Sequence, residues 1–194
     1  TNLAAGTNIG LGSYATTNES NGTMTISLAD ETGTSDSLTL TIGDAAADDD
    51  VDATIKTTGI ETITVARAAT DADNAALNMT AAKAATINVT GATTAAAQTA
   101  LGTLSTTTTK VDASAAPGLL SVTASATGTE IITKVGSAGN TIAGGAVNDT
   151  ITLGTLNGDD ADGAGGTDTL NATVKTSTTE ATSNFEVVNY TIGD

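Results

Sequence analysis

Polar and apolar residues alternate with a period of two in short runs along most of the chain. These runs are 23–28 (TMTISL), 37–42 (SLTLTI), 61–65 (ETITV), 77–80 (LNMT), 86–89 (TINV), 119–123 (LLSVT), 130–135 (EIITKV), 150–153 (TITL), 169–174 (TLNATV) and 186–192 (EVVNYTI). Gly, Asn, Asp or Ala/Thr turns flank each run, and this pattern predicts β-strands with one buried face. The Ala-rich segment 94–104 (TAAAQTALGTL) predicts one short helix that ends near Gly102.

The strand pattern contains a long-period echo. Two copies of the pattern D-x-L-x-φ-x-φ, each followed by φ-E-x-φ-x-φ, occur in the chain, where φ is apolar. The first copy is Asp36–Ile42 followed by Gly59–Val65, and the second is Asp168–Val174 followed by Asn184–Tyr190. The echo predicts one module of roughly 130 residues and the opening of a second. The glutamates of the two echoes, Glu61 and Glu186, are interpreted as structural residues that bond to backbone amides at a turn.

A shorter period begins at Leu120. Strand centres recur there in steps of about ten residues, as in a parallel β-helix or β-roll with two short strands and two turns per coil. The spacing predicts an all-β fold of this kind, with antiparallel β-sandwich modules as the alternative. Three segments are expected: 1–35 continues a preceding module, 36–109 forms a β module with the short helix near 94–104, and 110–194 forms a Gly/Asp-rich region and the start of the next module.

Composition restricts the kind of core. The chain has one Phe, two Tyr, no Trp, no Cys and one Pro, so Val, Ile and Leu must fill a thin, regular core without disulfides. The net charge of −16, from 22 acidic and 6 basic residues, argues against binding nucleic acid or an anionic membrane surface. No run of apolar residues approaches the length of a membrane span, so membrane insertion is not expected. The same charge makes a compact state repel itself unless cations compensate.

Two Gly/Asp turns carry the candidate chemistry. Residues 144–152 (GGAVNDTIT) and 163–171 (GAGGTDTLN) match the calcium-binding repeat G-G-x-G-x-D-x-U-x with one departure each, Val147 and Ala164. Residues 136–142 are a degenerate copy, and 157–162 (NGDDAD) form an oxygen-rich turn. Ca²⁺ takes six to eight oxygen ligands, and glycine lets successive carbonyls turn toward one ion.

The predicted calcium ligands are therefore Gly144, Gly145, Asn148, Asp149, Asn157, Asp159, Asp160, Asp162, Gly163, Gly165 and Asp168. The alternative is that these are ordinary tight turns, in which Asp149 and Asp168 accept hydrogen bonds from backbone N–H groups.

A family resemblance supports the calcium hypothesis. The stretch 111–124, which contains VDASA and GLLSVTA, precedes the D-T-I and D-T-L repeats, and together they resemble surface-layer (S-layer) proteins of the Caulobacter-like kind. More broadly, they are similar to RTX-repeat proteins exported by type I secretion. The resemblance covers roughly residues 36–194. It implies calcium-dependent folding outside the cell, an export signal beyond this segment and self-assembly into a lattice on the bacterial surface.

Catalysis has little support in the sequence. The chain has no His and no Cys, and three aromatic side chains offer almost no platform for sugar rings. Two non-enzymatic hypotheses remain. The first is a structural S-layer protein that assembles with copies of itself, attached to a cell-surface polysaccharide through regions outside this segment. The second is a stalk or ligand-binding repeat module of a large secreted RTX-type adhesin.

Overall fold

The computed structural model describes residues 2–3, 7–11, 22–43, 51–68, 74–91, 97–116, 118–124, 128–133, 139–154, 156, 158–174 and 180–193. In this part of the chain there are eighteen β-strands and no helix. The predicted all-β class is confirmed.

The strands form two nine-stranded sheets that separate odd from even strands. The first sheet contains β1 (Asn2–Leu3), β3 (Gly22–Leu28), β5 (Val51–Thr58), β7 (Ala75–Ala81), β9 (Gln98–Thr103), β11 (Leu119–Thr123), β13 (Thr141–Ala143), β15 (Asp160–Asp162) and β17 (Ala181–Ser183). The second contains β2 (Thr7–Leu11), β4 (Ser37–Ile42), β6 (Thr62–Arg67), β8 (Thr86–Gly91), β10 (Lys110–Ala115), β12 (Glu130–Thr133), β14 (Thr150–Leu153), β16 (Thr169–Val174) and β18 (Val187–Ile192).

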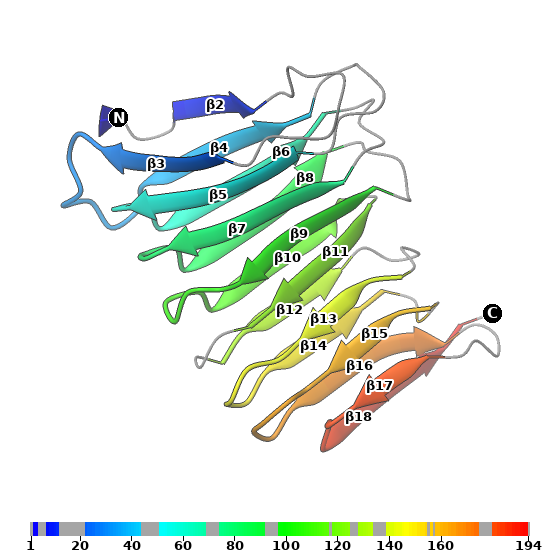
Figure 1. Ribbon diagram of the computed structural model, residues 1–194. Helices are drawn as coiled ribbons and strands as arrows, with labels where there is room; N and C mark the ends of the chain where they lie inside the picture. Colours follow the sequence, from blue (N-terminus) through cyan, green and yellow to red (C-terminus); the bar gives the residue numbers. More distant parts are fainter. Residues whose placement is uncertain are drawn as a thin grey trace.

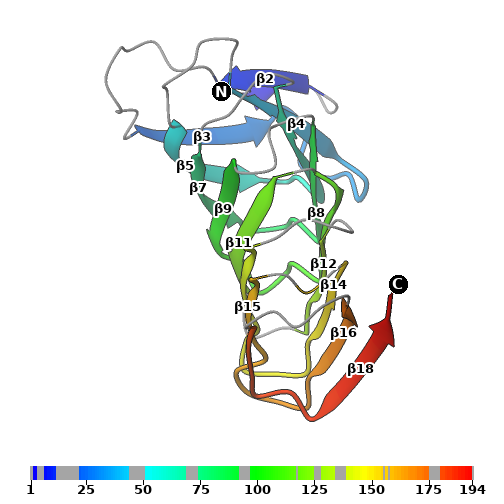
Figure 2. The ribbon, with the colours of Figure 1, turned by 90° about the vertical axis from the view of Figure 1, so that its right-hand side faces the viewer.

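Neighbouring strands within each sheet are parallel at every described pairing, for example β4 with β6 and β14 with β16. Each odd strand and the even strand after it form one coil, and successive coils stack from the N-terminal to the C-terminal end (Figure 1). Figure 2 shows the two sheets facing each other. The fold is a parallel, β-roll-like stack, and the antiparallel sandwich alternative is wrong for the described strands. Pairing also continues across the expected segment boundary at 109/110, where β8 pairs with β10.

The core lies between the sheets and consists of columns of apolar side chains. One column in the second sheet is formed by residues that pair in register from coil to coil and are at most 1% exposed: Leu38, Ile63, Ile87, Val111, Ile131, Ile151 and Leu170. Burial of each such side chain contributes roughly 1.5–3 kcal/mol. The core is thin but continuous, which is how a chain with so few aromatic residues buries enough apolar surface.

The predicted helix at 94–104 is wrong for its described residues. Residues 98–103 form β9, where Thr99 and Leu101 are buried while Gln98 and Ala100 are partly exposed. Alanine has the highest helix propensity, but propensity is a weak determinant of structure, and pairing of β9 with both β7 and β11 overrides it. Gly102 does not end a helix: its φ of +70° coincides with a register shift between β9 and β11.

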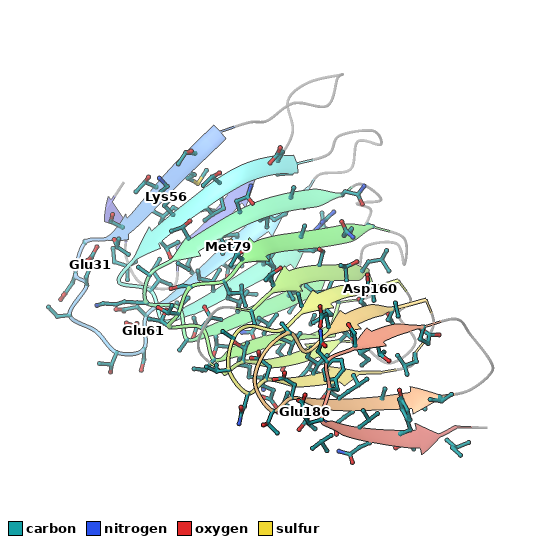
Figure 3. The ribbon with its side chains drawn as sticks, turned by 60° about the horizontal axis from the view of Figure 1, so that its bottom comes forward. Glu31, Lys56, Glu61, Met79, Asp160 and Glu186 are labelled. Atoms are coloured by element: carbon teal, nitrogen blue, oxygen red, sulfur yellow. The ribbon has the colours of Figure 1, made fainter. Side chains whose placement is uncertain are left out.

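Turns join the strands along two edges of the stack. We call the edge where odd strands lead into even strands the Gly/Asp edge; it includes the turns at 29–36, 59–61, 144–149, 163–168 and 184–186. The edge where even strands lead into odd strands is the opposite edge, and its described parts include 139–140, 158–159 and 180. Figure 3 shows Glu61 and Glu186 at the Gly/Asp edge and Asp160 across the stack from them.

Candidate metal centre

The residue just before each even strand occupies an equivalent position at the Gly/Asp edge from coil to coil. Its carbonyl accepts a hydrogen bond from the next coil, as in Thr169 N to Asp149 O at 2.9 Å and Val187 N to Asp168 O at 3.0 Å. From the turn before β4 to the turn before β18, the residues at this position are Asp36, Glu61, Ala85, Thr109, Thr129, Asp149, Asp168 and Glu186. Five of the eight are acidic, so the edge stacks carboxylates above one another.

The last three carboxylates at this position each accept a hydrogen bond from a backbone N–H of the preceding coil. The backbone N–H of Thr129 donates to Asp149 Oδ1 at 2.6 Å, and that of Asp149 donates to Asp168 Oδ1 at 2.7 Å. The N–H of Asp168 donates to Glu186 Oε2 at 2.8 Å. Hydrogen bonds from backbone N–H groups to carboxylates are charge-assisted and strong, so we call this chain of contacts the carboxylate ladder.

The same contact occurs at the other end of the stack. The N–H of Asp36 donates to Glu61 Oε2 at 2.9 Å, across 25 residues of sequence. The pair formed by Asp36 and Glu61 therefore repeats the pair formed by Asp168 and Glu186. The interpretation of both glutamates as structural residues that bond to backbone amides is confirmed.

Glycine is required where neighbouring turns touch. A Cβ on Gly144 would lie 2.2 Å from Gly163 O, and a Cβ on Gly163 would lie 2.1 Å from Asn184 O. Any larger residue would push the coils apart at these two positions. The first glycine of each repeat thus serves the packing of backbone on backbone.

Within the ladder, Asp149 and Asp168 differ in what their oxygens bind. Both oxygens of Asp149 are used, because its Oδ2 also accepts the N–H of Gly145 at 2.6 Å. Asp168 is completely buried, and its Oδ2 has no hydrogen-bond partner among the described residues. This Oδ2 lies at the turn 2.9 Å from the Cβ position of Gly163. The turn therefore holds one buried carboxylate oxygen that no described donor satisfies.

Burial raises the pKa of Asp149, against the lowering effect of the two N–H donors, and the nearby charge of Asp168 raises it further. No cationic side chain compensates these two carboxylates in the described ion pairs, which involve only Lys110 with Asp112 and Glu130. The negative charge of Asp168 therefore adds to burial in disfavouring the charged form of Asp149.

Asp162 lies beside this turn at the end of β15. Its Oδ1 accepts the side-chain N–H of Asn184 at 2.7 Å and the backbone N–H of Ala164 at 3.0 Å. These two hydrogen bonds hold the pKa of Asp162 below its ordinary value. Asn148, also a predicted ligand, accepts the N–H of Thr167 at 2.9 Å. Both side chains tie adjacent turns together.

The structure separates the remaining predicted ligands from this group. Asp159 and Asp160 belong to the opposite edge and the start of β15, and Asn157 lies outside the described residues. Asp159 is part of a second ladder that sequence reasoning missed: its Oδ1 accepts the N–H of Asn140 at 2.8 Å, and its own N–H donates to Glu180 Oε2 at 3.0 Å. The signal was present, since each of these three residues directly precedes a short strand at steps of about 20 residues.

Asp149 and Asp168 accept hydrogen bonds from backbone N–H groups, but most of these bonds join coils instead of closing a local turn, so the choice between ordinary turns and calcium sites stays open. No group of three or more acidic side chains gathers as a metal site in the described part of the chain. At these turns the described structure leaves one buried carboxylate oxygen, Asp168 Oδ2, without a hydrogen bond, whereas Ca²⁺ takes six to eight oxygen ligands. Calcium at this point stays a prediction.

No family model, curated protein or solved structure gives a significant match to this chain. No helix in the described residues is long and apolar enough to cross a membrane.

Proposed function

We propose that this chain is a non-catalytic structural segment of a bacterial surface layer, which folds and assembles outside the cell with Ca²⁺. The observation that carries the proposal is the buried, unpartnered Oδ2 of Asp168 within a Gly-rich turn. A buried carboxylate without a counter-charge is costly, and a bound divalent cation would compensate it.

The charge distribution supports a cation at this place. Asp149 and Asp168 are both buried and lie in adjacent coils, in a chain of net charge −16. A cation bound at Asp168 would lower the repulsion between the two carboxylates while leaving the hydrogen bonds of Asp149 intact. The metal would then stabilise the stacking of β14 on β16.

The architecture supports a scaffold role. The outer face of the second sheet carries small polar side chains in register, among them Thr39, Thr64 and Asn88. The described grooves on the outer faces are shallow and about 260 Å³ in size, and their lining contains a single carboxylate, Asp52. Flat faces and a continuous core suit a tile or a spacer better than a reaction site.

Thermal unfolding with excess chelator, with millimolar Ca²⁺ and with millimolar Mg²⁺ tests the metal part of the proposal. We expect Ca²⁺ to raise the midpoint, because a ligand of the native state stabilises by mass action. We expect Mg²⁺ to do less, because it demands near-ideal octahedral geometry and keeps its waters. An unchanged midpoint in Ca²⁺ would remove calcium from the proposal.

Electron microscopy of the purified protein tests the surface-layer part. We expect ordered two-dimensional sheets that form with Ca²⁺ and disperse on chelation. Monomers under every condition that bind cells or glycans would instead support the adhesin-module alternative.

A further inference from the structure

Three turns of the Gly/Asp edge end in an aspartate directly before an even strand, and they leave different oxygens free. In the turn that ends at Asp149, the backbone N–H of Gly145, four residues earlier, donates to Asp149 Oδ2 at 2.6 Å. In the turn that ends at Asp168, the buried Oδ2 has no hydrogen-bond partner among the described residues. Asp36 Oδ2, in the turn before β4, is buried and unpartnered in the same way. One turn is thus closed by its own backbone, and we call the other two open turns.

The open turns have an aspartate six residues before their final aspartate. In the turn of Asp168 this residue is Asp162. In the turn of Asp36 it is Asp30. The closed turn has Ala143 at this place, and Ala143 pairs in register with Asp162 of the next coil. Neighbouring coils therefore differ at one equivalent position, by the presence or absence of a carboxylate.

Each of these two aspartates accepts the N–H that corresponds to the closing N–H of Gly145. Asp162 Oδ1 accepts the N–H of Ala164 at 3.0 Å. Asp30 Oδ1 accepts the N–H of Thr32 at 2.9 Å. Ala164 and Thr32 both stand four residues before the final aspartate of their turns, as Gly145 does in the closed turn. Because each residue has a single backbone N–H, a bond to an aspartate two residues earlier competes with closure of the turn.

The backbone conformation of the turn does not account for the difference. Ala164 has a φ of +67°, but Thr32 does not belong to the described non-glycine residues with positive φ, and its N–H is diverted all the same. What the two open turns share is the aspartate that takes the N–H. In the later turn this aspartate is itself held, because the side-chain N–H of Asn184 donates to Asp162 Oδ1 at 2.7 Å.

We propose that Asp162 is a positioning residue for the cation turn, which binds the N–H of Ala164 and thereby keeps Asp168 Oδ2 free for Ca²⁺. The inference rests on the proposed function, and it adds the residue that determines which of two equivalent aspartates, Asp149 or Asp168, takes a cation. Asp162 acts through the backbone and needs no contact with the ion. This role differs from that of a direct ligand, which the sequence predicts for Asp162.

Calcium calorimetry of three variants separates the two roles. Asp162→Ala should weaken Ca²⁺ binding by roughly 10- to 100-fold, the usual effect of losing a residue that orients a metal ligand. Asp162→Asn keeps a carbonyl oxygen for the N–H of Ala164, so its affinity should stay close to that of the original chain. Asp160→Ala removes the same charge from an exposed position of β15 and should behave like Asp162→Asn. If Asp162→Asn lost as much affinity as Asp162→Ala, Asp162 would be a ligand and the positioning role would be wrong.

A crystal structure of Asp162→Ala in chelator gives a readout that does not depend on calcium. We expect the N–H of Ala164 to donate to Asp168 Oδ2 at about 3 Å, as the N–H of Gly145 does to Asp149 Oδ2 in the original chain. An Ala164 N–H that stayed away from Asp168 would overturn the inference, whatever the calcium affinity. Absence of calcium binding in the original chain would instead refute the proposed function.

A reciprocal exchange tests the same position from the other side. Ala143→Asp combined with Asp162→Ala moves the carboxylate one coil earlier without stacking two carboxylates in register. In its crystal structure the N–H of Gly145 should leave Asp149 Oδ2, and the open turn should pass from Asp168 to Asp149. An N–H of Gly145 that remained on Asp149 would show that the aspartate six residues earlier does not decide the arrangement.

Discussion

Replacement of Asp168 by Asn should have opposite effects on the free energy of unfolding in chelator and in calcium. The variant keeps an oxygen for the N–H of Asp149, now 2.7 Å from Oδ1, and replaces the unpartnered Oδ2 by an amide. In chelator the loss of a buried, uncompensated charge offsets the cost of burying the amide, so we expect a free energy of unfolding equal to the original or about 1 kcal/mol higher.

In calcium the same variant should be clearly less stable than the original chain. A free Ca²⁺ concentration 100 times the dissociation constant stabilises the original by about 2.7 kcal/mol. For a chain of this length that corresponds to a rise in midpoint of roughly 5–10 °C. Asp168→Asn should lose most of this rise, because its carboxylate charge is the anionic ligand at the turn.

Asp149→Asn is the matched control, one coil earlier in the same ladder. Its two oxygens accept the N–H groups of Thr129 and Gly145, both at 2.6 Å, and an amide can serve only one of them. One buried N–H loses its partner, which costs about 1–3 kcal/mol with or without calcium. Thermal and urea unfolding of the three proteins in chelator and in Ca²⁺ gives all the values needed. If both variants kept the full calcium response, Asp168 would be only a turn residue.

Three further predictions concern stability in chelator. Ala164→Gly should raise the free energy of unfolding by about 0.5–1 kcal/mol, because Ala164 has a φ of +67° that only glycine adopts without strain; urea unfolding measures it, and a loss of stability would contradict the strain argument. Thr57→Val should add about 1 kcal/mol, because the Thr57 hydroxyl is buried without a hydrogen-bond partner in the described structure; an unchanged urea midpoint would indicate that the hydroxyl has found a partner. The folded pKa of Asp149 is raised above 3.8, so its contribution to stability is complete below that value and is lost as pH rises through the raised pKa. The thermal midpoint should therefore rise as pH falls from neutral toward about 4, and a flat profile, or one that Asp149→Asn leaves unchanged, would refute the assignment.

Much of the fold could be predicted from the order of the residues. In segments such as 37–42 and 150–153 the polar and apolar residues alternate, and the structure places strands there with alternate residues buried. Such prediction succeeds because successive side chains of a strand point to opposite faces. The alternation of polar and apolar residues therefore indicates which side chains are buried. The Gly/Asp motif also predicted turns at these positions. The structure shows why glycine is needed there, since a Cβ on Gly144 or Gly163 would have no room.

Two features of the fold depend on pairing between strands that are distant in sequence, and only the tertiary structure decided them. The segment 98–103 became β9 because β7 and β11 lie on either side of it, whereas its alanines by themselves favour a helix. The parallel order of the sheets likewise follows from contacts between coils, which strand spacing could not distinguish from a sandwich.

The difference between Asp149 and Asp168 is also a property of the stack. Both residues occupy the same position in equivalent motifs, so the sequence predicts the same role for both. In the folded chain Gly145 donates its N–H to Asp149 Oδ2, whereas Asp168 Oδ2 receives no such donor from the described residues. A motif determines which side chains reach the edge, but the hydrogen bonds of neighbouring coils determine which oxygen remains for a cation.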